Sequence, residues 1–79
     1  MTDGRDTLMW EVRATPGRRD ELLRWVESAV DRDADIYLGG EERIVVIVRG
    51  AERLPEPPED LLARPVHQWP FRHYRTVTG

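Results

Sequence analysis

The chain has 79 residues, a formal net charge of −3 and no cysteine. Disulfides are therefore excluded, and a zinc site is disfavoured because His67 and His73 are the only histidines. Since a domain of this size buries only about 60–65% of its unfolded surface, the remaining sources of stability are a compact core or a second copy of the chain.

The first half of the chain predicts a strand, a helix and a second, short strand. Residues 7–14 alternate between apolar and polar side chains, which is typical of a strand with one buried face. A Pro-Gly turn follows, and residues 18–31 then carry an apolar arc of about 160°, which predicts an amphipathic helix. Residues 34–38 predict the short strand.

The third predicted strand covers residues 42–49 and has the strongest strand signal in the chain. Its centre, from Ile44 to Val48, is five consecutive β-branched residues, a run that usually has both sides covered. The tight Gly39-Gly40 connection before it indicates that this strand returns antiparallel to the second one.

The last part of the chain is broken by prolines. Residues 58–64 can form about two helical turns, with proline and acids at the start where they suit a helix. Residues 66–77 predict a final strand. Because Pro70 cannot donate to a ladder, this strand is expected at an edge or with a bulge.

The order of these elements predicts an α+β fold, the ferredoxin-like βαββαβ arrangement, as a single domain over residues 1–79. The expected sheet has four antiparallel strands in the order 4-1-3-2, with both helices on one face. The helix-facing residues would be Leu8, Trp10, Val12, Ile44, Val46 and Val48. The opposite face would carry Met9, Glu11, Arg13, Val45 and Ile47, with Arg43 and Arg49 at the ends.

This opposite face predicts a homodimer. The helices cannot reach Met9, Val45 and Ile47, and leaving them in water forgoes roughly 1.5–3 kcal/mol of burial per side chain. Packing the sheet against that of a second copy recovers this burial, and Glu11 and Arg13 could pair across such an interface. The alternative is a monomer in which this face, part apolar and part charged, stays in contact with water. The charged Glu11 and Arg13 favour this alternative.

Charge is distributed unevenly along the chain. Residues 31–60 carry nine acids and four Arg, a balance of −5, whereas residues 64–79 carry three Arg and no acid, a balance of +3. This pattern predicts that Arg64, Arg72 and Arg75 meet the acidic segment, within the subunit or across a dimer, and it does not suggest nucleic acid. No apolar run approaches the roughly 20 residues of a membrane helix. The polar residues 1–7 and the lack of cysteine fit a cytoplasmic protein.

Aromatic side chains supply the candidate site. His67, Trp69, Phe71 and His73 alternate along the final strand. They either line a pocket for a flat ligand, with a histidine that moves a proton near neutral pH, or Trp69 and Phe71 belong to the core. Trp10 and Trp25 either pack in the core or wall a cavity, and Tyr37 offers a hydroxyl near the sheet edge. The candidate ligand-contacting residues are Trp10, Trp25, Tyr37, Trp69 and Phe71, and the candidate bases are His67 and His73.

Several other kinds of site are excluded. The Gly39-Gly40 pair lacks the pattern of a phosphate-binding loop, and the single serine, Ser28, falls on the polar side of the predicted helix. The run from Ile44 to Val48 lacks the aromatic residues of an RNA-recognition sheet. No metal site or cofactor is expected.

The chain resembles the dimeric α/β-barrel superfamily, particularly its antibiotic-biosynthesis-monooxygenase-like group. The likeness is carried by the first strand with Thr15-Pro16-Gly17-Arg18, the helix after it, the Ile44–Val48 strand and the closing His67-Gln68-Trp69-Pro70-Phe71. The resemblance implies a homodimer with its two sheets packed together as a dimeric α/β barrel. In the oxygenases of the group it implies a cavity between helices and sheet that holds an aromatic substrate. By position the residues there would be Trp25, Tyr37, His67, Trp69 and His73.

Three functions follow as hypotheses. The first is a small homodimeric domain that binds an aromatic ligand or acts as an accessory protein. The second is a monooxygenase that acts on an aromatic polyketide-like substrate without a cofactor, with His67 or His73 as the base. The third is an amino-acid-sensing domain of the ACT type, which shares the βαββαβ order. In such domains a glycine after the first strand touches the ligand, and Pro16-Gly17 fits that position loosely. A histidine-lined cavity large enough for a tricyclic ligand favours the second. A helix layer packed solidly by Trp10 and Trp25 favours the first.

Overall fold

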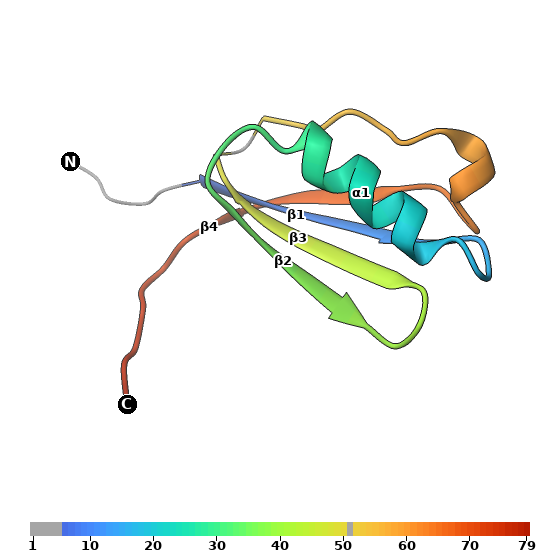
Figure 1. The fold of residues 1–79 in the computed structure, drawn as a ribbon. Coiled ribbons are helices and arrows are strands. Elements are labelled where there is room, and N and C mark those ends of the chain that lie inside the picture. Colours follow the sequence, from blue (N-terminus) through green and yellow to red (C-terminus); the bar gives the residue numbers. More distant parts are fainter. Residues whose placement is uncertain (1–5, 51) are drawn as a thin grey trace.

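Four strands form one antiparallel sheet in the predicted order. The computed structural model describes residues 6–50 and 52–79. The strands β1 (Asp6–Arg13), β2 (Ala34–Gly39), β3 (Arg43–Arg49) and β4 (His67–Arg72) lie in the order β2-β3-β1-β4. The helix α1 (Arg19–Ala29) covers one face of this sheet (Figure 1). This small α+β architecture is compatible with a ferredoxin-like fold.

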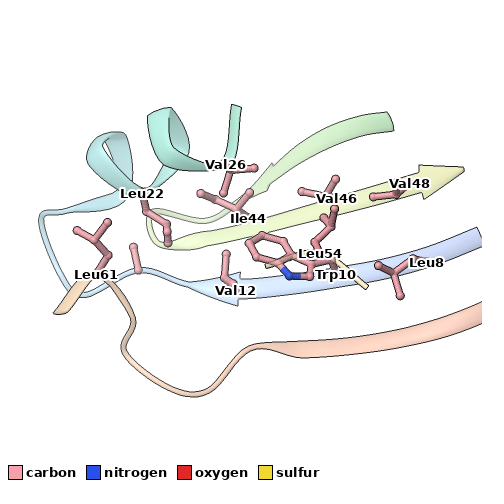
Figure 2. Close-up of a cluster of buried hydrophobic side chains, with 11 residues drawn as sticks. Leu8, Trp10, Val12, Leu22, Val26, Ile44, Val46, Val48, Leu54 and Leu61 are labelled. Atoms are coloured by element: carbon pink, nitrogen blue, oxygen red, sulfur yellow. The ribbon is translucent and has the colours of Figure 1, made fainter. Parts of the chain in front are cut away.

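The hydrophobic core lies between the sheet and α1. Every second residue of β1 and of β3 turns toward the helix, because successive side chains of a strand point to opposite faces of the sheet. All six residues predicted to face the helix are at most 1% exposed, and α1 contributes Leu22 and Val26 to the same cluster (Figure 2). The described core comprises Leu8, Trp10, Val12, Ala14, Leu22, Val26, Ile44, Val46, Val48, Leu54 and Leu61.

The prediction of a second helix over residues 58–64 is wrong. In place of two turns over residues 58–64 there is one 3-10 turn, η1 (Glu59–Leu61), which contacts α1. The chain becomes extended at Leu62, and a bridge joins Leu62 to Ala14 just beyond β1. The Thr15 amide donates to the Leu61 carbonyl at 2.9 Å, and the Ala63 amide donates to the Arg13 carbonyl at 2.8 Å. These bonds to the end of β1 replace the ones that a longer helix would make.

Gln68 binds the proline-rich segment, residues 52–58, to the sheet. Its side chain points to the helix side of β4 because it pairs directly with buried Trp10. The side-chain amide donates to the Leu54 carbonyl at 3.2 Å, and its oxygen accepts from the Leu54 amide at 3.1 Å. Gln68 thus satisfies two backbone groups of a segment that has no strand partner of its own, and it holds Leu54 in the core.

The final strand is shorter than predicted. β4 ends at Arg72, so His73 to Val77 lie beyond it. Pro70 stands within β4 opposite Leu8 without a break in register, and β4 is an edge strand, as the proline predicts. Of the polar residues 1–7, which fit a cytoplasmic protein, the first five lie outside the described residues. In the described ranges, none of the helices has the length and apolar character needed to traverse a bilayer.

Candidate functional site

The candidate site is the sheet face turned away from α1, called here the open face. Cross-strand register fixes which side chains share it. One row across the sheet runs Trp69, Met9, Ile47 and Asp35, and the next runs His67, Glu11, Val45 and Tyr37. Every residue in these rows alternates with a neighbour that points toward the core. The open face therefore carries the residues predicted for it.

The middle of the open face is aliphatic. Met9 on β1 and Val45 and Ile47 on β3 are neither buried nor fully exposed. Strands on both sides shield their flanks, but nothing in the described part of the chain covers them from above, because α1 packs on the other face (Figure 1). Their prediction as an apolar surface beyond the reach of the helix is confirmed.

Aromatic side chains border this aliphatic middle at both edges of the sheet. Tyr37 on β2 is 55% exposed, and on β4 Trp69 is 41% and Phe71 is 53% exposed. The His67 ring meets the Trp69 ring edge to face, with 5.4 Å between their centroids. The alternative that placed Trp69 and Phe71 in the core is therefore wrong. Pro70 leaves the register intact, so both rings turn to the open face.

Charged groups occupy one end of the open face. The Arg43 Nε donates to a carboxylate oxygen of Glu11, whose side chain is half-buried. Arg13 stands directly opposite Arg43, an unfavourable pairing of like charges, and its buried Nε has no acceptor among the described residues. Within the subunit Glu11 is thus paired with Arg43, and the pairing of Glu11 with Arg13 across an interface stays a prediction.

A hollow beside this charged end was not predicted. It is lined by Arg13, Gly39, Gly40, Glu41, Glu42 and Arg43, it is open to solvent, and its volume is about 460 Å³. Its walls are polar and come from β1 and the β2–β3 hairpin. The sequence pattern contains the hairpin glycines, but the meeting of Arg13 with the hairpin depends on the β1–β3 register, which the pattern alone does not fix.

The predicted ligand-contacting residues divide between the two faces of the sheet. Tyr37, Trp69 and Phe71 lie on the open face, whereas Trp10 and Trp25 lie on the helix side. The two indoles stack with centroids 6.4 Å apart and ring planes 19° from parallel. Trp10 is 1% exposed, so this pair fills the layer between helix and sheet instead of walling a cavity for a ligand.

The two candidate bases are also apart. His67 lines a small hollow next to Glu11 and Arg13, whose free volume of about 10 Å³ is room for one water and not for an aromatic ring. His73 lies beyond β4, where its Nε2 is 2.9 Å from the Thr76 hydroxyl. The described residues hold no group of three or more His, Asp or Glu side chains arranged to bind a metal ion. The structure therefore brings His67 to the open face with Trp69 and leaves His73 outside it.

No protein family, curated protein or solved structure matches this chain.

Proposed function

We propose that this chain is a small homodimeric domain of the antibiotic-biosynthesis-monooxygenase-like type, acting as a binding or accessory protein for an aromatic ligand and not as an enzyme. The observation that carries the proposal is the aliphatic middle of the open face. Met9, Val45 and Ile47 have no cover within the described subunit, and the corresponding face of a second copy matches them in chemistry. Two such sheets packed together would form a dimeric α/β barrel.

The aromatic edges support a ligand between the subunits. In a dimer built on the open face, Tyr37 and Trp69 of each copy lie at the border of the interface, where rings are exposed in one subunit. Flat ligands bind in apolar clefts with a few polar groups at the rim, and His67 and Arg13 supply such groups. The lack of cysteine supports a cytoplasmic location for the protein.

The stacked tryptophans favour the binding protein over the monooxygenase. An oxygenase site between helix and sheet needs space there, and Trp10 with Trp25 occupies it. His67 is exposed on the open face, on the other side of the sheet from this layer, so it is not placed to act as the base in a site between helix and sheet.

Ligand binding is tested with anthraquinone-2-sulfonate, a water-soluble tricyclic probe, by calorimetric titration. The unchanged protein should bind the probe saturably, and Trp69→Ala should weaken binding about fivefold, the equivalent of roughly 1 kcal/mol of ring stacking. Leu38→Ala is the matched control, because Leu38 is similarly exposed but lies on the helix side of β2. Its affinity should not change.

A second measurement separates binding from catalysis. With anthrone, an oxidisable tricyclic compound, an oxygen electrode should record no uptake above that of buffer. Equal affinity of the Trp69→Ala and unchanged proteins for the probe contradicts the proposed ligand site. Oxygen uptake that disappears in His67→Ala contradicts the non-catalytic role and establishes the monooxygenase in its place.

A further inference from the structure

Two arginines face each other at the charged end of the open face. Arg13, the last residue of β1, pairs directly with Arg43, the first residue of β3. Like charges opposite each other in a sheet are unfavourable, so each guanidinium needs a compensating group. Arg43 has one, because its Nε donates to Glu11. Among the described residues Arg13 has none: it forms no ion pair, and its buried Nε has no acceptor.

The register places Arg13 at a hollow of the size that ligands occupy. The end of β1 and the β2–β3 hairpin lie at the same end of the sheet (Figure 1). There the row of Arg13 and Arg43 continues to Gly39, which has no side chain to fill the space. The solvent-open hollow of about 460 Å³ lies at this row, with both arginines in its wall. Small-molecule sites measure roughly 300–1,000 Å³, and a guanidinium without an acid partner in such a wall is suited to bind an anion.

A surface for an aromatic ring lies next to this hollow. Val45 and Tyr37 pair with each other across β3 and β2, two residues from Arg43 and Gly39 along the same strands and on the same face. Val45 is half-buried and Tyr37 is 55% exposed, so both offer surface to a ring. Because a strand rises about 3.3 Å per residue, the two rows are about 7 Å apart. An acid group attached to a ring over Val45 and Tyr37 is thus within reach of the long Arg13 side chain.

Two acids of the hollow restrict the charge of the ligand. Glu41 and Glu42 line it as well, and within the described residues no ion pair joins either of them to Arg13. Glu41 is exposed, so water screens its charge, whereas the half-buried Arg13 is screened less. Both carboxylates still repel a dianion such as sulfate twice as strongly as a monoanion. A single carboxylate or sulfonate, whose oxygens match the fork of a guanidinium, fits this arrangement best.

We infer that the aromatic ligand carries one acid group, a carboxylate or a sulfonate, and that Arg13 binds it. The ring lies over Val45 and Tyr37, and the acid group enters the hollow and accepts hydrogen bonds from the Arg13 guanidinium. This inference rests on the proposed function, because it specifies the ligand of that function. It makes Arg13 the residue that selects an aromatic acid over an uncharged aromatic compound of the same shape.

Two probes of the same shape and different charge test the inference: 2-naphthoate and 2-naphthamide, titrated by calorimetry at neutral pH. The unchanged protein should bind 2-naphthoate at least about tenfold more tightly, the low end of what hydrogen bonds to a charged group contribute. In Arg13→Gln this preference should vanish, while the affinity for 2-naphthamide stays the same. Arg24→Gln is the matched control, because it removes the same charge from the exposed side of α1, and it should keep the preference.

The outcomes separate the acid site from the proposed function. Comparison of the two probes on the unchanged protein needs no variant. Equal, saturable binding of both probes overturns the role of Arg13, as expected if Glu11 of a second copy is its acceptor, and leaves the proposed function standing. Displacement of 2-naphthoate by excess sulfate at constant ionic strength overturns the restriction to a singly charged aromatic acid. Absence of saturable binding by either probe overturns both the acid site and the proposed function.

Discussion

Ile47→Arg should turn the dimer into a folded monomer. Ile47 lies in the aliphatic middle of the open face, paired with Met9 on one side and with Asp35 on the other. In a monomer the new guanidinium stays in water beside Asp35, so the fold should tolerate it. In a dimer packed on this face two guanidinium groups are buried, at a cost of several kcal/mol. We expect the dimer dissociation constant to rise at least about a thousandfold, equivalent to about 4 kcal/mol.

The matched control for this variant is Ser28→Arg. It adds the same charge on the exposed side of α1, in the other layer of the molecule. Sedimentation velocity over a dilution series gives the dissociation constant, and circular dichroism checks the fold. An Ile47→Arg protein that associates as tightly as Ser28→Arg shows that the open face is not the subunit interface.

Trp10→Ala should come close to unfolding the domain. Trp10 is one of the largest fully buried side chains, and it stacks on Trp25 at the centre of the helix–sheet layer. Removal of a buried tryptophan costs about 3–5 kcal/mol. A 79-residue domain has a total stability of roughly 4–12 kcal/mol at 0.05–0.15 kcal/mol per residue, so this loss is a large part of it. Urea denaturation at a fixed protein concentration measures the change.

Trp10→Phe distinguishes the contribution of the stacked ring to stability from that of the indole nitrogen. The Trp10 Nε1 is buried and has no acceptor among the described residues, which costs about 1–3 kcal/mol for an unsatisfied donor. Phenylalanine keeps most of the stacked ring and removes this donor. The smaller ring lowers the free energy of unfolding, whereas removal of the unsatisfied donor raises it. Trp10→Phe should therefore lose far less stability than Trp10→Ala. Equal losses for the two variants would contradict the stacked ring as the main contribution of Trp10 to stability.

The sheet and its two faces could be predicted because they depend on local alternation. β1 carries a period of two that places Trp10 inward and Met9 outward. β3 is apolar from Ile44 to Val48, and the flanking Arg43 and Arg49 fall on the same, outward side as Val45. The Gly39-Gly40 connection fixed the hairpin, and Gly40 has the positive φ of 61° that such a turn favours in glycine. These signals act over a few residues, so no distant contact had to be known.

The elements that were missed depend on distant partners. η1 stops after one turn because Leu61 and Ala63 bond to the far end of β1, which no local pattern reveals. β4 pairs with β1 as far as Arg72, which lies opposite Asp6, the first of the described residues. The residues after Arg72 have a strand-like composition but pair with no strand in the described part of the chain, and the predicted strand was therefore too long.

The sequence predicted which residues belong to the candidate site, but not how they divide between the two faces of the sheet. Alternation along β4 placed His67, Trp69 and Phe71 on one side of the strand. Which side faces the core depends on the β1–β4 register, in which Trp10 pairs with Gln68. That pairing turns the aromatic side outward and separates it from Trp25 by the thickness of the sheet. Like charges at Arg13 and Arg43 also meet only through register.

Sedimentation equilibrium of the unchanged protein tests the central claim most directly. The claim is that the open face binds its own copy, and one chain has a mass of 9.2 kDa. At micromolar concentration the account predicts a single species of 18.4 kDa, twice the mass of one chain. A mass of 9.2 kDa that stays constant with rising concentration would contradict it.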